Sequence, residues 1–533
     1  VQPEGDVARS SEAGVKDLVD QDVSDRKGIG SKESYGEPTA ELSVQKAYEV
    51  SKVLGAPSAD EAVEADVCWL IAQAMSQATI VNNEVHGNAK SGVQFKGGAC
   101  PLLEGNVIRD GQAAALLVCG GARGVVRNNH LSGHVKTELQ LSDAGTSPLV
   151  ERNIIHSSSS GGVLAFSNAG GLLRRNEVHG NHKANVRLSE SSCTRLEDNT
   201  IRNGKDCGLA ISSGCTSVVV GNDIRENVKA NVLMWGAETK PTLVANKIHH
   251  GLQSGVYMYA AAGCNLIRNE IWQNAGPGVL VTEASEPLLR QNMIRDGEDY
   301  GVLIHEDGRG TLECNNVHSN RTYGIACLTG ASPIVKYNWI HGRRQGGVLV
   351  DQGGAGEFEY NEIEMNQKSG ITLRGASGPA FRYNRIHDGA DSGIHAMHGA
   401  GGIIEENLIF KNEHAGIAVE TGASPIIKNN KIYDGKQGGV FFFENGRGTM
   451  SGNEVWDNED FGLQIIEDGD PTVHDNIFRQ QAESKLGTPP VWIHSAGRGT
   501  VQDNEVVDSH WHGMVIGQLA QPLVQGNKIH ACT

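Results

Sequence analysis

The sequence predicts an all-β chain folded as a right-handed parallel β-helix, because three columns recur at a period of 23 residues. The first column is an asparagine found twenty times, in steps of 23 residues except for two of 24 and one of 28. An apolar side chain stands two residues after each asparagine, and glycine stands nine residues after it in fourteen of nineteen testable copies. A fixed period of this length indicates a solenoid. The asparagines are Asn83, Asn106, Asn129, Asn153, Asn176, Asn199, Asn222, Asn246, Asn269, Asn292, Asn315, Asn338, Asn361, Asn384, Asn407, Asn430, Asn453, Asn476, Asn504 and Asn527.

Each copy is too short for a pair of helices and alternates apolar and polar residues in short β-branched runs, as in residues 416–419. This pattern predicts three short strands per rung around a narrow core. Asparagine tolerates a left-handed backbone, so we expect it at the bend between the second and third strands of a rung. Stacked one above another, the asparagine amides are expected to hydrogen-bond as a ladder.

A second alternation doubles the period to 46 residues. Five residues after the ladder asparagine, the rungs alternate between asparagine and glycine. The asparagines are Asn181, Asn227, Asn274, Asn320, Asn366, Asn412 and Asn458, and the glycines are Gly204, Gly251, Gly297, Gly389 and Gly435. The ancestral unit is therefore expected to have been two coils.

The chain divides into three parts. Residues 1–42 are polar and lack an apolar period, which predicts a flexible N-terminal arm. Residues 43–77 predict a helical cap, with a capping box at 58–61, that covers the open end of the first rung or docks a partner. Residues 78–533 are expected to form the β-helix, and nothing in the sequence covers its last rung, at 528–530, so we expect either that the native chain continues or that a partner or a second copy sits there.

Composition limits the cellular compartments and the classes of partner that we expect. The net charge of −17 argues against nucleic acid and against an anionic membrane surface. No signal peptide and no run of about 18 apolar residues is visible. The ten cysteines form no regular framework, which favours buried free thiols and an intracellular, reducing compartment. We expect protein partners.

The column three residues after the ladder asparagine is the candidate binding surface. It holds histidine, arginine or an aromatic residue in seventeen of twenty rungs, and it is expected to point outward. Two explanations stay open: a protein-recognition stripe, or flat side chains that simply stack on parallel rungs. An insertion at 482–490 is expected to project as a second binding element. The candidate partner-binding residues are Trp272, Arg295, His318, His341, His387, Phe410, Tyr433, Trp456, Pro489 and Pro490.

Catalytic, cofactor and metal sites are not predicted. The acidic residues scatter, as at 306–307 and 467–470, and no phosphate loop or nucleophile elbow is present. His318 and His341 lie one rung apart, but two ligands without a third are weak evidence for a metal. A polysaccharide-active enzyme on this fold would instead need carboxylates that converge on two or three neighbouring rungs.

The phrases at 384–397, 430–458 and 406–430 resemble the β-helix of the F-box only protein eleven family, over about 83–533. The resemblance implies a substrate-binding platform of a cullin–RING ubiquitin ligase. Residues 1–80 contain no recognisable F-box, and no zinc module follows the β-helix, so only the platform is carried over. We therefore expect a non-catalytic protein-binding scaffold. The alternatives are a structural subunit of a large assembly and, third, a polysaccharide lyase, hydrolase or epimerase.

Overall fold

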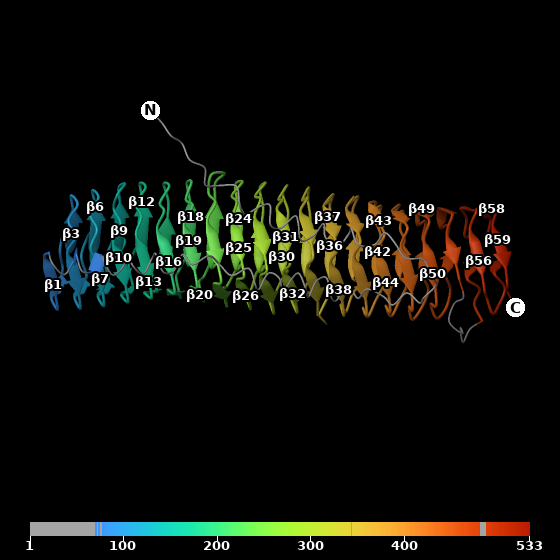
Figure 1. The fold of residues 1–533 in the computed structure, drawn as a ribbon, viewed down its shortest axis with the longest axis horizontal. Coiled ribbons are helices and arrows are strands. Elements are labelled where there is room, and N and C mark those ends of the chain that lie inside the picture. The colour runs from blue at the N-terminus through green and yellow to red at the C-terminus, as the bar shows by residue number, and fades with distance from the viewer. Residues whose placement is uncertain (1–69, 72, 75–76, 343, 480–486, 533) are drawn as a thin grey trace, which may run out of the picture. The chain divides into compact units, whose positions relative to one another are not determined.

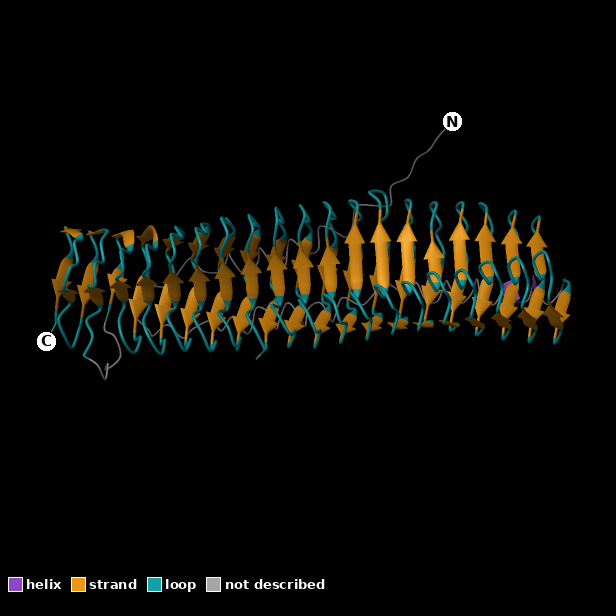
Figure 2. Cartoon of the chain, turned by 180° about the vertical axis from the view of Figure 1, so that it is seen from behind, coloured by secondary structure: helices purple, strands orange, loops and turns teal. Residues whose placement is uncertain are grey.

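The computed structural model describes residues 70–71, 73–74, 77–342, 344–479 and 487–532. Within this part the chain winds as a parallel β-helix in which each strand pairs with its equivalent one rung further along. The rungs follow one another along one axis from β1 to β59, and the strands align in rows joined by short turns (Figures 1 and 2). The expected N-terminal arm, 1–42, lies outside the described residues.

Sheet A is the first of the three parallel sheets, and its strands immediately precede the ladder asparagines. In most of its three-residue strands the central residue, such as Leu103 or Val335, enters the core. Its strands are β1 (Thr79–Val81), β4 (Leu102–Glu104), β7 (Val125–Arg127), β10 (Leu149–Glu151), β13 (Leu172–Arg174), β16 (Arg195–Glu197), β19 (Val218–Val220), β22 (Thr242–Val244), β25 (Asn265–Ile267), β28 (Leu288–Arg290), β31 (Thr311–Glu313), β34 (Ile334–Lys336), β37 (Glu357–Glu359), β40 (Ala380–Arg382), β43 (Ile403–Glu405), β46 (Ile426–Lys428), β49 (Arg447–Ser451), β52 (Asp470–His474), β55 (Thr500–Gln502) and β58 (Leu523–Gln525).

Sheet B follows directly after the asparagines and carries the predicted column on its outer surface. In most of its strands the central apolar residue, such as Ile363, is buried between two partly exposed neighbours. Its strands are β2 (Glu84–His86), β5 (Val107–Arg109), β8 (His130–Ser132), β11 (Ile154–His156), β14 (Glu177–His179), β17 (Thr200–Arg202), β20 (Asp223–Arg225), β23 (Lys247–His249), β26 (Glu270–Trp272), β29 (Met293–Arg295), β32 (Asn316–His318), β35 (Trp339–His341), β38 (Glu362–Glu364), β41 (Arg385–His387), β44 (Leu408–Phe410), β47 (Lys431–Tyr433), β50 (Glu454–Trp456), β53 (Ile477–Phe478), β56 (Glu505–Val507) and β59 (Lys528–His530).

Sheet C completes each rung and sends two side chains per strand into the core, as Val279 and Val281 do. Its strands are β3 (Val93–Lys96), β6 (Leu116–Cys119), β9 (Leu139–Ser142), β12 (Val163–Phe166), β15 (Val186–Leu188), β18 (Leu209–Ser212), β21 (Val232–Trp235), β24 (Val256–Tyr259), β27 (Val279–Val281), β30 (Val302–Ile304), β33 (Ile325–Cys327), β36 (Val348–Val350), β39 (Ile371–Leu373), β42 (Ile394–Ala396), β45 (Ile417–Val419), β48 (Val440–Phe442), β51 (Leu463–Ile465), β54 (Val491–Ile493) and β57 (Met514–Ile516).

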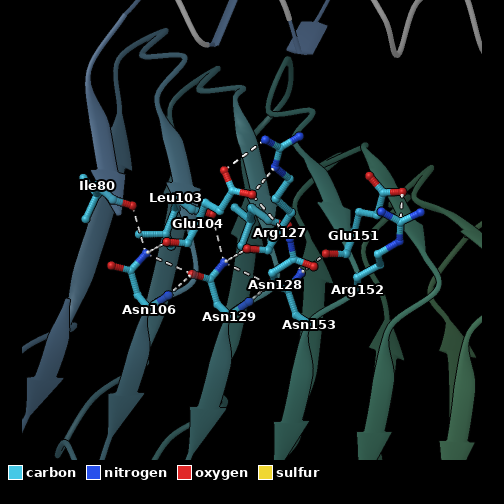
Figure 3. Close-up of polar contacts among 11 residues, drawn as sticks. Ile80, Leu103, Glu104, Asn106, Arg127, Asn128, Asn129, Glu151, Arg152 and Asn153 are labelled. Atoms are coloured by element: carbon cyan, nitrogen blue, oxygen red, sulfur yellow. Dashed lines mark hydrogen bonds and ion pairs between the residues drawn. The ribbon is translucent and has the colours of Figure 1, made fainter. Parts of the chain in front are cut away.

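The asparagine ladder forms as predicted, between sheets A and B. The side-chain oxygen of Asn129 accepts from the backbone and side-chain nitrogens of Asn106, at 2.9 and 3.0 Å. The Asn129 amide in turn donates to the Leu103 carbonyl at 2.9 Å and to Asn153 at 2.9 Å (Figure 3). Each buried amide is thereby satisfied by the rungs on either side of it.

The left-handed residue at this bend is not the ladder asparagine, which corrects our expectation. The residue before it has the positive φ, for example 53° at Asn429 and 57° at Tyr383. The ladder asparagine itself keeps an ordinary backbone, because its side chain must point into the stack. Glycine, asparagine and aspartate, which tolerate this conformation best, hold ten of the twenty preceding positions, and arginine, alanine, glutamine, cysteine, tyrosine and glutamate hold the other ten.

The 46-residue alternation has a steric cause. The Gly435 N–H donates to the Asn458 side-chain oxygen of the next rung at 3.0 Å. A Cβ at Gly435 would lie 2.8 Å from that oxygen. Glycine avoids this contact and precedes the asparagine in several rungs, but before Asn181 the position holds Ser158, whose N–H makes the same hydrogen bond at 3.0 Å.

The described helical residues differ from the expected end cap. Leu70, Ile71 and Ala74 pack against an outward-facing apolar cluster that includes Leu102 and Val125 of sheet A. Figure 1 shows this short blue segment beside β7. At the described helical positions, the helix therefore covers an apolar lateral surface; the rest of the predicted cap lies outside the described residues. None of the helices in the described part has the length and apolar character needed to cross a membrane.

The cysteines behave as expected. All nine described cysteines are free, and six of them are buried: Cys100, Cys119, Cys207, Cys215, Cys264 and Cys327. Burial raises the pKa of the Cys207 and Cys215 thiols to about 11, which keeps them protonated and unreactive.

Candidate functional site

The predicted column lies on the outer surface of sheet B, and its side chains stack along the rod. His249 and Trp272 lie with ring centroids 4.1 Å apart and an interplanar angle of 11°. The Arg295 guanidinium follows, 5.3 Å from the Trp272 ring. His318 and His341 stack at 4.9 Å.

A second stack begins one rung beyond Glu364. His387 and Phe410 lie 4.4 Å apart, Phe410 and Tyr433 lie 5.1 Å apart, and Tyr433 and Trp456 lie 4.6 Å apart, all within 12° of parallel. These distances confirm that the column stacks. Because the rings stack face to face, their faces contact one another and their edges point toward solvent. His387 and Phe410 are only 7% and 8% exposed, so their neighbours on the outer surface of sheet B cover these two predicted residues almost completely.

Burial within the column lowers the pKa of three of its histidines, His249, His318 and His341. Desolvation, assisted by the neighbouring His318, lowers the pKa of His341 to about 4. Its Nε2 lies 3.0 Å from the side-chain oxygen of Asn316. Burial also lowers the pKa of His318 and of His249. These imidazoles are therefore neutral at physiological pH.

The break between the two stacks brings acidic residues together, which the sequence interpretation missed. His387 Nε2 lies 2.6 Å from Glu362 Oε1 and 3.9 Å from Glu364 Oε2, and its Nδ1 lies 2.6 Å from Asp388 Oδ2. Burial opposes the charged form of His387, but hydrogen bonds to Glu362 and Asp388 outweigh it and raise its pKa. The expectation that acidic residues scatter is wrong here. The available signal was the 23-residue register, which places Glu364 beside His387.

A second missed feature is a tyrosine stack at the corner between sheets A and B. Tyr337 and Tyr360 lie 5.3 Å apart, and Tyr360 and Tyr383 lie 5.0 Å apart, both nearly parallel. Tyr360 and Tyr383 are 42% and 41% exposed, and Trp339 beside them is 38% exposed. We call Tyr337, Trp339, Tyr360 and Tyr383 the aromatic corner.

The backbone of the aromatic corner is strained. All three tyrosines occupy the left-handed position, with φ between 55° and 57°. A bulky side chain is unusual there and costs on the order of 1 kcal/mol per residue. The signal in the sequence was a Tyr-Asn pair repeated at 337–338, 360–361 and 383–384.

The two predicted prolines do not project from the rod. Pro489 and Pro490 are buried, and the Pro490 carbonyl accepts hydrogen bonds from the backbone of Gly462 and Leu463 at 2.9 and 2.8 Å. Proline has no N–H, but it retains its acceptor, so the pair continues the ladder on that side. Residues 482–486 of the insertion lie outside the described residues.

The rung at the C-terminal side exposes apolar side chains. Ile516, Leu523 and Ile529 are 51%, 57% and 47% exposed. A partner at this surface stays a prediction.

Comparison with known proteins identifies the fold family. Five overlapping matches to the family described as right handed beta helix region span 67–181, 144–248, 188–338, 278–424 and 398–529. No curated protein matches the chain.

Solved structures with a similar fold are distant. The periplasmic alginate epimerase AlgG is 13% identical, with a TM-score of 0.32, over 68% of this chain and 78% of that one. The A-module of the Azotobacter vinelandii mannuronan C-5 epimerase AlgE4 is 14% identical, with a TM-score of 0.27, over 68% and 89%. A chain of the Vag8–C1 inhibitor complex is 12% identical, with a TM-score of 0.32, over 85% and 100%. Such similarities carry no argument about activity, whereas the family matches cover most of the sequence: this chain belongs to the right-handed β-helix family.

Proposed function

We propose that the protein is a non-catalytic scaffold that binds a protein partner along the side of the β-helix, with the aromatic corner as the centre of the interface. The observation that carries the proposal is the exposed tyrosine stack held in a strained backbone. Asparagine occupies the same left-handed position at 82, 128 and 429 without that cost. Exposed aromatics maintained against strain point to a use outside the fold itself.

The geometry favours a protein partner over a polysaccharide. Sugar rings are commonly held against the open faces of aromatic side chains, but here the faces lie against one another within the stack. The edges and hydroxyl groups that remain suit a polar interface rich in hydrogen bonds. Glu359 and Glu405 beside the corner are paired with Lys336 and Arg382, so the preference for a partner with basic side chains rests on the net charge of −17 of the whole chain.

The sequence resemblance to the F-box only protein eleven family supports the same role, since it implies a substrate-binding platform. The stacked column of sheet B, including Trp272 and His318, would extend the interface from the corner. The second candidate function is that of a structural subunit with a fixed place in a larger assembly. The stoichiometry of the co-purifying proteins distinguishes a scaffold from such a subunit.

The test is to purify the native protein, identify its companions by mass spectrometry and measure their affinity for defined variants. The triple variant Tyr337→Asn, Tyr360→Asn and Tyr383→Asn removes the aromatic corner while placing a favoured residue in the left-handed position. We expect it to fold and to lose at least tenfold in affinity for the identified partner. The variant Trp272→Ala with His318→Ala tests the extension along sheet B.

The matched control removes an ion pair from sheet A. Arg290 and Glu313 lie 2.7 Å apart on its surface, and the variant Arg290→Ala with Glu313→Ala should bind normally. Unchanged affinity in the triple tyrosine variant would refute the aromatic corner as the interface. Companions in constant stoichiometry would favour the structural-subunit role.

A further inference from the structure

A buried histidine on sheet B is surrounded by carboxylates from two neighbouring rungs. Glu362 and Glu364 belong to β38, and His387 lies opposite Glu364 on β41. Glu364 is the one acidic residue in the twenty-member column. Among the described residues, Glu364, His387 and Asp388 have donor atoms within 4.8 Å of one another, and Glu362, which contacts His387, is not part of that group.

The hydrogen bonding orients the imidazole as in metal sites. His387 Nδ1 lies 2.6 Å from Asp388 Oδ2, so an Nδ1–H donated to that carboxylate leaves Nε2 as the ligand atom. A histidine that binds a metal commonly donates its other N–H to a carboxylate or carbonyl in this way. Nε2 then faces Glu362 and Glu364.

The spacing suits a small cation. Donor atoms about 2.0–2.2 Å from a tetrahedral zinc ion stand roughly 3.3 Å apart. The distances from His387 Nε2 to Glu362 Oε1 and Glu364 Oε2 are 2.6 and 3.9 Å, on either side of that value. Small side-chain movements would equalise them.

The excess of negative charge in this group also favours the binding of a cation. Glu362, Glu364 and Asp388 carry three negative charges, and Arg385, 3.1 Å from Glu362, supplies one positive charge. A dication bound at Nε2 takes the place of the imidazole proton there, and the charge of −2 left by the three carboxylates and Arg385 is then neutralised by that one ion. The side chains of Glu362, Glu364 and His387 are 13%, 16% and 9% exposed, so water screens the charge only in part.

We propose that Glu362, Glu364 and His387 bind a first-row divalent metal ion, with zinc as the best match, and that Asp388 orients the histidine. One imidazole nitrogen with carboxylate oxygens suits zinc better than calcium or magnesium, which prefer oxygen alone. Asp388, whose side chain is 49% exposed, marks the side from which the ion enters.

Trp339 provides a direct optical readout. Its Nε1 donates a hydrogen bond to Glu364 Oε1 at 2.8 Å, so an ion drawn onto Glu364 changes the surroundings of the indole. Titration of tag-free protein with zinc chloride by calorimetry is expected to show one saturable site with a Kd of micromolar or below. A change in tryptophan fluorescence should accompany it and be absent from Trp339→Phe.

Two variants and one control decide the assignment. Glu364→Gln, which keeps the shape of the side chain, should weaken zinc binding at least tenfold, and His387→Gln should abolish it. His130→Gln is the control, because it removes a histidine from a different pair, in which His130 Nε2 lies 2.5 Å from His156 Nε2. This variant should bind zinc as the parent protein does. Absence of saturable binding, unchanged binding in Glu364→Gln, or loss of binding in His130→Gln alone would each overturn the proposal.

Discussion

His134 Nδ1 lies 2.6 Å from Glu138 Oε2, and these side chains are 1% and 0% exposed. The Glu138 carboxylate also accepts from the backbone nitrogen of His134 at 2.9 Å. Two rungs later the same positions hold Asn181 and Asn185, whose side chains lie 2.8 Å apart. An ionisable pair thus replaces an amide pair inside one corner of the solenoid.

This pair predicts a rescue by double substitution. His134→Asn alone leaves the Glu138 carboxylate buried without its partner and should destabilise the fold by about 3–5 kcal/mol. His134→Asn with Glu138→Asn recreates the Asn181–Asn185 arrangement and should recover most of that loss. Denaturant unfolding of the parent protein, the single variant and the double variant measures the loss of stability and its recovery. A double variant no more stable than the single one would contradict the prediction.

The asparagine ladder should be strongest in the middle of the rod. Asn361 accepts from Asn338 N and Nδ2 at 2.9 and 3.0 Å, and donates to Val335 O and Asn384 Oδ1, both at 2.9 Å. Asn361→Ala leaves the Asn338 N–H buried without a partner, at a cost of about 3–5 kcal/mol for the lost bonds and unsatisfied groups.

The control for this substitution lies at the end of the ladder. Asn527 accepts equivalent bonds from Asn504, but its surroundings are partly exposed, so water replaces the lost bonds. Asn527→Ala should cost about 1 kcal/mol or less. Thermal unfolding of the two variants compares them, and equal losses would refute the role of burial.

The asparagine–glycine alternation predicts opposite effects for two glycine substitutions. Gly435→Ala places a Cβ 2.8 Å from the Asn458 oxygen and should cost about 1–3 kcal/mol through overpacking. Gly378→Ala meets no atom within 4 Å and lies outside the left-handed region, so it should be neutral or slightly stabilising. The unfolding midpoints of both variants provide the measurement, and a tolerated Gly435→Ala would argue against the steric cause.

The lowered pKa of His341 predicts a specific loss of stability in acid. Because the unfolded chain binds the proton at an ordinary pKa near 6.5 and the folded protein at about 4, the folded state is fully favoured above pH 6.5. The contribution of His341 to the free energy of unfolding falls by about 1–3 kcal/mol as the pH drops from 6.5 toward 4. His341→Phe, which retains a flat ring, should reduce the difference in melting temperature between pH 7.5 and pH 5.

The control for the pH experiment is His398→Asn, in an exposed turn with φ of 53°. This variant should follow the parent protein at both pH values. An equal acid response in His341→Phe and the parent would show that His341 does not contribute to it.

The repeat itself could be predicted from sequence because each rung contacts mainly its neighbours. The Asn430 column, the inward Ile432 column and the alternation of Gly435 with Asn458 all recur at fixed spacing, and every one keeps its place in the structure. A solenoid reduces tertiary structure to a one-dimensional register, so periodicity alone determined the fold and the stacking of the column.

The tertiary structure decided the features that depend on side-chain direction and on contacts across that register. The diagonal contact of Glu362 with His387, the left-handed position of Tyr360 before its asparagine and the burial of Pro490 are such features. The packing of Leu70 and Ile71 against sheet A is another. A repeat fixes which residues are neighbours, but the rotamer of each side chain and the space around it follow only from three-dimensional packing.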